Sequence, residues 1–165
     1  MSDDRSSARV RRATDDDIPA LVAHRVALRT EAHPRRDDEV RAFRDATTEA
    51  YRELTATGEL IAWVAERDGA VIGSVAAFIR RTLPNMDGPA LEARVQSMYI
   101  VPERRRGGTG TALLQALLAE MRARRVRRVY LRPSVSGRRF YPGFGFAASD
   151  EMELYVATDG GPAHV

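Results

Sequence analysis

The glycine-rich stretch RRRGGTG at residues 104–110 constrains the fold of this 165-residue chain more than any other segment. An extended apolar segment, LEARVQSMYIV, precedes it and stops at Pro102. Leucines at helical spacing follow it and predict a helix from about Thr109 to Arg125, after which residues 126–134 predict a strand. Two strands of one sheet that are joined through a helix run parallel, so the segment predicts a parallel pair.

The other elements predict a mostly antiparallel sheet around that pair. The chain has no internal repeat, and the expected elements are a strand at 9–14, helices at 14–34 and 37–58, two hairpin strands within 60–81 that turn at 67–69, a loop at 83–89, a strand at 91–101, a short helical or turn segment at 137–146 and a last strand at 150–157. This order predicts an α/β (α+β) fold, with a mixed sheet of six to seven strands, a central parallel pair and about four flanking helices.

Composition limits the classes of function. The chain has no cysteine, which excludes disulfides, thiolate catalysis and cysteine-bound metal, and we expect no metal site. It has no apolar run long enough to span a bilayer, and its first ten residues lack the apolar core of a signal peptide, so the expected location is the cytoplasm. All 26 basic residues are arginine and 23 acids oppose them, so one anionic ligand site is enough to account for the net charge of +3.

The glycine-rich stretch has the chemistry of a phosphate-binding loop. The first amides of a helix have no partners within the helix, and the helix dipole favours an anion there. Glycines let the backbone approach a ligand closely, and arginines add counter-charge. The stretch lacks the Gly-Lys-Ser/Thr of a P-loop, and Leu113 stands where a dinucleotide fingerprint has its third glycine. A pyrophosphate cradle and a plain helix start with solvated arginines are both open at this point.

Two separate motifs resemble those of the GNAT family of N-acetyltransferases. VPERRRGGTGTALL is similar to the family's acetyl-CoA-binding motif, and RRFYPGFGF is similar to a later aromatic segment. The residues at matching positions are Arg105, Gly108, Gly110, Tyr141, Gly145 and Phe146. The resemblance implies a GNAT fold and one acetyltransferase domain over residues 9–157, between a flexible N-terminus at 1–8 and a flexible tail at 158–165.

The resemblance also implies which residues meet acetyl-CoA. In the family, loop amides hold the pyrophosphate, the backbone of the preceding strand holds the pantetheine arm, and an amide of this strand polarises the thioester carbonyl. Carried onto this sequence, the coenzyme-binding residues are Met98, Tyr99, Ile100, Val101, Arg105, Arg106, Gly107, Gly108, Thr109, Gly110 and Thr111, with Tyr99 and Val101 the expected backbone contributors on the strand. Tyr141 matches the tyrosine that protonates the departing thiolate, and packing among neighbouring phenylalanines is its alternative role.

The general base is a departure from the family pattern. The position at which many members have a glutamate is Arg94 here, which cannot act as a base. Glu92 is a candidate base through a water molecule, and an ordinary exposed acid is its alternative role. His24 and His33 are further candidates near the first helix.

A second departure lies before the tyrosine. Ser134 stands where many members have an asparagine that helps to hold the pantetheine, so Ser134 is a candidate coenzyme contact. Arg138 is a candidate for the coenzyme's phosphates, with a solvated helix face as the alternative.

The sequence does not name the acceptor. The resemblance implies a pocket shaped by about residues 25–43 and 82–89, and an acceptor that is an amine on a small molecule, a peptide or a protein. A non-catalytic module that binds acyl-CoA is the main rival function, and a basic nucleic-acid-binding protein is a weaker one. We expect neither a nucleic-acid nor a membrane partner, and the sequence leaves a homodimer open.

Overall fold

The structure is a computed structural model that describes residues 8–154 apart from 32, 87 and 136. It divides into two compact units after Arg132. The first unit contains β1 (Arg9–Arg12), η1 (Asp15–Asp17), α1 (Ile18–Thr30), α2 (Asp37–Ala56), β2 (Leu60–Arg67), β3 (Ala70–Asn85), β4 (Gly88–Ile100), η2 (Pro102–Arg104), α3 (Thr109–Ala123) and β5 (Arg128–Leu131). The second contains the short 3-10 helix η3 (Tyr141–Phe144).

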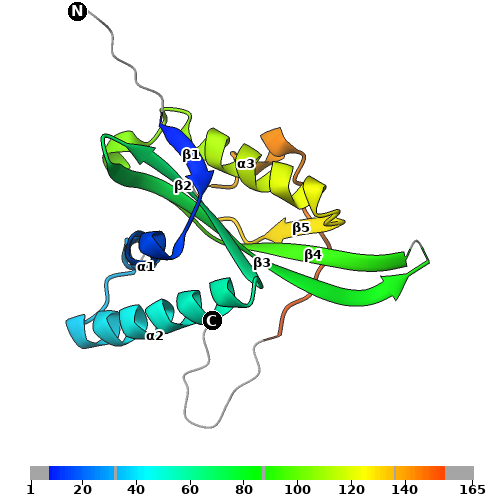
Figure 1. Ribbon diagram of the computed structural model, residues 1–165, viewed down its shortest axis with the longest axis horizontal. Coiled ribbons are helices and arrows are strands. Elements are labelled where there is room, and N and C mark those ends of the chain that lie inside the picture. Colours follow the sequence, from blue (N-terminus) through cyan, green and yellow to red (C-terminus); the bar gives the residue numbers. More distant parts are fainter. Residues whose placement is uncertain (1–7, 32, 87, 136, 155–165) are drawn as a thin grey trace, which may run out of the picture. The chain divides into compact units, whose positions relative to one another are not determined.

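One five-stranded sheet, in the order β1-β2-β3-β4-β5, organises the first unit. Neighbouring strands are antiparallel except for β4 and β5, which run parallel as the strand–helix–strand segment predicts. α1 and α2 lie on one side of the sheet and α3 on the other, while the β3–β4 hairpin projects beyond the remaining strands (Figure 1). Most of the coenzyme-binding candidates lie on β4 and on the loop that joins it to α3.

The described residues hold five strands and three α-helices, so the expectation of six to seven strands and about four helices was wrong. The parallel pair lies at the edge of this sheet rather than at its centre. Residues 150–154, where a last strand was expected, form no strand, and the rest of that segment lies outside the described residues. The expected flexible ends at 1–8 and 158–165 also lie outside the described part, except for Ala8.

The loop expected at residues 83–89 is mostly strand. β3 continues to Asn85 and β4 begins again at Gly88, so only a tight connection separates them. Pro84 falls in a register shift between Thr82 and Asn85, where no ladder hydrogen bond from its nitrogen is needed.

Local signals explain the other element ends. The β2–β3 hairpin turns at Asp68 and Gly69, which have φ angles of 53° and 74°, as a two-residue Asp-Gly turn requires. The first turn of α2 contains three acidic residues, and the positive end of the helix dipole stabilises their negative charge. None of the described helices is long and apolar enough to cross a membrane.

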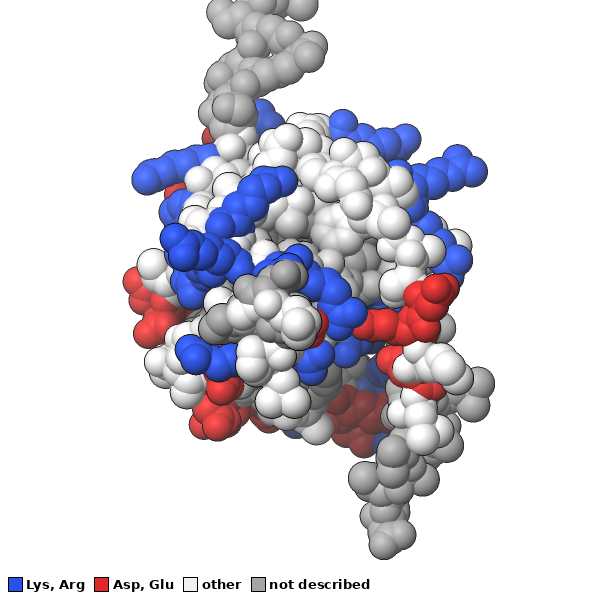
Figure 2. All heavy atoms as spheres, turned by 90° about the vertical axis from the view of Figure 1, so that its right-hand side faces the viewer, with Lys and Arg blue, Asp and Glu red and all other residues white. Residues whose placement is uncertain are grey.

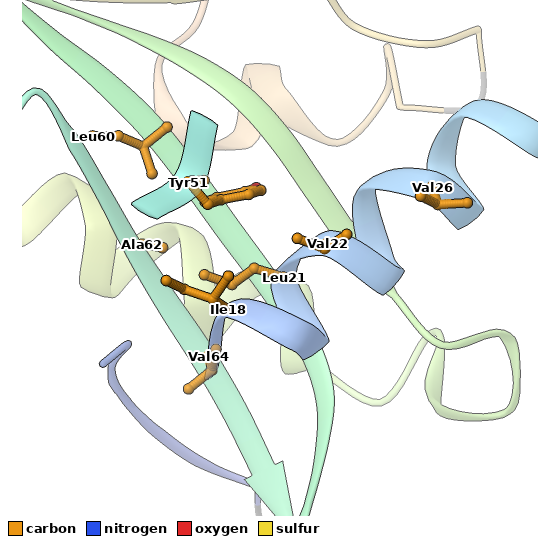
Figure 3. Packing of buried hydrophobic residues seen from close by; sticks show 9 residues of the cluster. Ile18, Leu21, Val22, Val26, Tyr51, Leu60, Ala62 and Val64 are labelled. Atoms are coloured by element: carbon orange, nitrogen blue, oxygen red, sulfur yellow. The ribbon is translucent and has the colours of Figure 1, made fainter. Parts of the chain in front are cut away.

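Two apolar layers hold the sheet between the helices. On one side a core cluster joins α1, α2, β2 and β3, and its buried members are Ile18, Leu21, Val22, Val26, Tyr51, Leu60, Ala62, Val64 and Ala76 (Figure 3). On the other side α3 buries Leu113, Leu114, Leu117, Leu118 and Met121. A Cβ at Gly73 would lie 2.6 Å from Ile100 Cδ1 and 3.2 Å from Leu113 Cδ1, so glycine lets β3, β4 and α3 pack closely.

Two irregularities in β4 shape the site. Ala76 pairs with Ser97 while Ala77 pairs with Val95, so Gln96 is an extra residue in a β-bulge. β5 pairs only with Glu92–Val95, and β4 therefore runs on from Gln96 to Ile100 without β5 beside it. The extra residue shifts the alternation of side chains along β4 by one position. Arg94 and Ser97 therefore both project to the side of the sheet that α1 covers.

Candidate functional site

The loop between β4 and α3 has a backbone suited to anions. Arg106 and Gly108 both have left-handed φ angles, of 64° and 81°, and Gly108 directly precedes α3. The first helical hydrogen bond runs from the Ala112 amide to the Gly108 carbonyl over 3.0 Å. The amides of the preceding residues, from Thr109 to Thr111, therefore have no partner within the helix. Left-handed turns at such a helix start can direct several amides toward one anion.

The backbone of β4 presents one of its edges beyond the end of β5. The Val101 amide donates to the Ile72 carbonyl over 3.0 Å, so Val101 points toward β3. In an antiparallel ladder the neighbouring residue points the opposite way, which directs the amide and carbonyl of Ile100 away from β3. The same alternation directs Met98 outward and Tyr99 inward. The backbone of Val101 and Tyr99, the expected contributors, is therefore turned to β3, and that of Ile100 is turned outward.

Arg105 reaches across to the end of α1. Its Nε donates to the Ile100 carbonyl over 3.0 Å, and its Nη2 donates to Glu31 Oε2 over 2.8 Å. The Tyr99 hydroxyl donates to the other oxygen of Glu31, and the Arg105 guanidinium lies 5.4 Å from the centre of the Tyr99 ring. We call Glu31, Tyr99 and Arg105 the loop clasp, because they join the loop to α1.

The pKa values of Tyr99 and Glu31 in the loop clasp are shifted in opposite directions. Burial, and then the hydrogen bond to Glu31, raise the pKa of Tyr99 to about 12. The hydrogen bonds from Tyr99 and Arg105 lower the pKa of Glu31. The sequence predicts a role of Arg105 toward phosphate but not its contact with Glu31, because Glu31 lies 74 residues away and leaves no local signal.

His24 is buried beneath the loop clasp. Its Nδ1 lies 2.9 Å from Ser74 Oγ, and its ring centre lies 5.2 Å from that of Tyr99. Burial lowers the pKa of His24, which keeps the imidazole neutral at pH 7. His33, the other histidine candidate, is exposed just beyond the end of α1.

Glu92, the candidate base, is engaged by two arginines. Its Oε2 accepts from Arg80 Nη2 over 3.0 Å, and its Oε1 lies 3.1 Å from Arg128 Nε. Burial raises its pKa, but the two arginines outweigh that effect and the net pKa is lowered. A carboxylate held in this way is a weak base, so the geometry does not favour a proton-accepting role for Glu92.

The second unit places the tyrosine motif in an aromatic cluster. The Tyr141 ring lies 5.3 Å from that of Phe140 and 5.6 Å from that of Phe146, and both contacts are edge-to-face. Burial raises the pKa of Tyr141. Ser134 Oγ accepts the Gly137 amide over 3.1 Å and so builds a turn, while Arg138 is exposed.

A small apolar pocket lies where α2 faces the sheet. Its volume is about 200 Å³, and it is lined by Arg25, Phe43, Ala46, Thr47, Ala50, Tyr51, Leu54, Leu60, Phe78 and Gln96. Arg25 Nη1 donates to the Gln96 carbonyl over 3.3 Å, which ties α1 to the bulge of β4. We call this hollow the α2 pocket.

Comparison with known proteins identifies the family. Residues 24–146 match the model of the acetyltransferase (GNAT) family, which is well over half of the chain. The chain belongs to this family. As a GNAT acetyltransferase it uses acetyl-CoA as the acyl donor. The loop before α3 and the outward edge of β4 fit that donor, since together they offer amides for phosphates and a strand edge for an extended amide-bearing arm.

Solved structures share the fold. A predicted acetyltransferase from Clostridium acetobutylicum with acetyl-CoA is 25% identical, with a TM-score of 0.77 over 90% of this chain and 96% of that one. A GCN5-related N-acetyltransferase from Ralstonia eutropha is 24% identical, with a TM-score of 0.80 over 92% and 100%. An aminoglycoside N-acetyltransferase in complex with CoA is 18% identical, with a TM-score of 0.73 over 95% and 99%. No curated protein matches the chain.

Proposed function

We propose that the protein transfers the acetyl group of acetyl-CoA directly to a primary amine, with donor and acceptor bound together. One observation carries the proposal: the left-handed residues Arg106 and Gly108 open the start of α3 next to the part of β4 that β5 leaves uncovered. This arrangement places a phosphate-binding backbone beside a strand segment that β5 does not pair with, as a long phosphorylated amide such as coenzyme A requires.

The donor is bound mainly by backbone groups in this proposal. The amides from Gly107 to Thr111 hold the pyrophosphate at the N-terminus of α3. The edge of β4 from Met98 to Ile100 pairs with the pantetheine arm, and an outward amide there polarises the thioester carbonyl. The Arg105 side chain keeps the loop in position through Glu31 and the Ile100 carbonyl.

The chemical step forms a carbon–nitrogen bond and breaks a carbon–sulfur bond. The acceptor first loses a proton to water, because Glu92 is held by two arginines and His24 is buried. The neutral amine then attacks the thioester carbonyl, the thiolate leaves and takes the phenolic proton of Tyr141, and the newly acylated nitrogen gives its surplus proton to water. Burial raises the pKa of Tyr141, so the phenol is protonated at neutral pH and recovers its proton through solvent.

The α2 pocket is our proposed acceptor site. It includes Arg25 and Phe43 from the segment expected to shape that site, and Gln96 from the bulge of β4. A wider hollow of about 600 Å³ lies at the start of α1, but its lining contains no residue of β4 or of the loop. The volume of the α2 pocket suits part of a small molecule better than a folded protein.

Release of free thiol from acetyl-CoA in the presence of an amine tests the proposal. The amines should include amino acids, polyamines, aminoglycosides and peptides with free N-termini. We expect turnover with at least one of them, and product mass larger by one acetyl group. Binding of acetyl-CoA without transfer to any amine would instead favour the non-catalytic module.

A further inference from the structure

Three arginines surround one tyrosine on the sheet near the α2 pocket. The guanidinium carbons of Arg80, Arg94 and Arg128 lie 5.7 Å, 5.9 Å and 5.1 Å from the centre of the Tyr130 ring. All three distances are within the range of cation–π contacts. We call these four residues the arginine patch. Arginine side chains are prominent around the projecting hairpin in the space-filling view (Figure 2).

Strand register explains why the patch forms. Arg80, Glu92 and Arg128 are direct partners across β3, β4 and β5. The next row across the same strands is Phe78, Arg94 and Tyr130. Directly paired residues project to the same face of a sheet, so both rows face the side that α1 and α2 cover.

Two arginines of the patch pair with Glu92, and Arg94 does not. Glu92 bridges Arg80 and Arg128 with contacts of 3.0 Å and 3.1 Å. Arg94 makes no ion pair within the described part of the chain. The guanidinium charge of Arg94 is therefore available to a further anion, and the neighbouring arginines favour an anion at this place.

The patch adjoins the proposed acceptor site. Phe78, which is the register partner of Arg94, and Gln96, which lies two residues beyond Arg94, both line the α2 pocket. Arg94 is four residues from Met98, or about 13 Å along an extended strand. An arginine side chain covers part of that distance, so a small molecule can reach both the patch and the outward edge of β4.

We propose that the arginine patch binds an anionic group of the acceptor, so that the substrate is an amine that also carries a carboxylate or a phosphate. Arg94 makes the principal contact, because planar guanidinium groups pair with both anions through two hydrogen bonds. Tyr130 holds the arginine side chains in place from beneath. This inference rests on the proposed acetyltransferase function and narrows its acceptor class.

Matched pairs of amines test the inference. O-phosphoethanolamine is compared with ethanolamine, and 4-aminobutanoate with butylamine, with acetyl-CoA saturating and free thiol as the readout. Within at least one pair we expect the anionic member to have a kcat/KM at least about tenfold higher, as a charge-assisted hydrogen bond provides. Equal kcat/KM within both pairs, or a preference for the neutral members, would overturn the inference.

Substitution of Arg94 locates the effect. Arg94→Gln should raise KM for the anionic amine by about 10- to 100-fold and leave its kcat nearly unchanged, because Arg94 binds the anionic group equally in the ground state and in the transition state. The kinetic constants for the neutral amine should also stay nearly unchanged. Arg94→Lys should recover part of the loss, since it keeps the charge. Arg122→Gln on the exposed surface of α3 is the matched control, and its kinetics should equal those of the wild type. Equal losses for charged and neutral amines in Arg94→Gln would assign Arg94 a structural role instead.

Calorimetry keeps the two proposals separate. Titration of O-phosphoethanolamine and of 4-aminobutanoate into wild type and Arg94→Gln is done with and without coenzyme A. If no amine is acetylated but either anion binds the wild type and not Arg94→Gln, the patch is supported and the acetyl-transfer proposal fails. If neither anion binds the wild type, the patch inference fails whatever the outcome with other amines.

Discussion

Gly108 is the single residue on which the loop conformation depends most. Its φ angle of 81° strains any residue with a Cβ, although no atom lies within 4 Å of the position that a Cβ would occupy. Gly108→Ala should therefore lower the free energy of unfolding by about 1–2 kcal/mol and weaken coenzyme A binding as well. Gly58→Ala is a matched control, because Gly58 has a φ angle of 74°, is equally unobstructed and lies at the end of α2.

Urea unfolding and calorimetry with coenzyme A separate the two effects. Both variants should lose similar stability, but only Gly108→Ala should lose affinity for the coenzyme. Equal affinities in the two variants would show that the loop backbone does not bind the phosphates.

Tyr141 sets the alkaline limit of activity in the proposed mechanism. Its pKa is raised by burial above the ordinary value of 10.0, so the proton donor remains protonated up to alkaline pH. Tyr141→Phe should lower kcat by about 10²- to 10⁴-fold, the usual contribution of a general acid. The acidic limb of the profile of kcat/KM against pH should stay in place, because it reports deprotonation of the amine and not of Tyr141. Unchanged turnover in Tyr141→Phe would remove this residue from the mechanism.

The loop clasp links two elements, α1 and β4, through one carboxylate. Glu31→Gln removes the negative charge that, together with burial, raises the pKa of Tyr99 to about 12. The pKa of Tyr99 should therefore fall in this variant while remaining above its ordinary value, because burial persists. Ultraviolet titration of tyrosine ionisation measures the change, and Tyr99→Phe identifies which step of the titration belongs to Tyr99. A titration identical to that of the wild type would mean that Glu31 does not contact Tyr99 in solution.

Elements with local signals were predictable, and those that depend on distant pairing were not. α3 and its glycine start follow from leucine spacing and from residues next to each other in sequence. The bulge at Gln96 and the short pairing of β5 arise where segments far apart in sequence meet, and no local pattern encodes them. For the same reason sequence could show that Arg94 is not a base but could not place it beside Tyr130. Residues 83–85 and 88–89 lie in strands although a loop was expected at 83–89, because the pairing of β3 with β4 accommodates Pro84 at a register shift.

At the scale of the whole molecule, donor and acceptor depend on different kinds of group. The proposed donor site uses backbone amides at a helix start and a strand edge, which explains the glycines in its family motif. The proposed acceptor site uses side chains of α1, α2 and three strands, so its specificity can change without altering the loop. Family motifs therefore identify the donor and leave the acceptor to be read from the structure.

Asp17 connects the sheet to the helix layer and should affect the stability of the whole molecule. Its buried carboxylate accepts Arg11 Nη1 and Nη2 over 2.7 Å and 2.9 Å, and also the Thr14 amide over 2.8 Å. Asp17→Asn should lower the free energy of unfolding at pH 7 by about 2 kcal/mol, because hydrogen bonds to a charged group are lost. Asp16→Asn, at the exposed neighbouring position, should change it by less than about 0.5 kcal/mol.

The effect of Asp17 should disappear in acid. Hydrogen bonds from Arg11 lower the pKa of Asp17 more than burial raises it. A carboxylate whose pKa is lowered by folding stabilises the folded state above its unfolded pKa of about 3.9, and this stabilisation is lost as pH falls through the lower folded pKa. Urea unfolding should thus give a constant difference between wild type and Asp17→Asn from pH 7 to 5 and a shrinking one below about pH 4. A difference that persists unchanged at pH 2 would mean that packing, and not the ionised carboxylate, makes Asp17 stabilising.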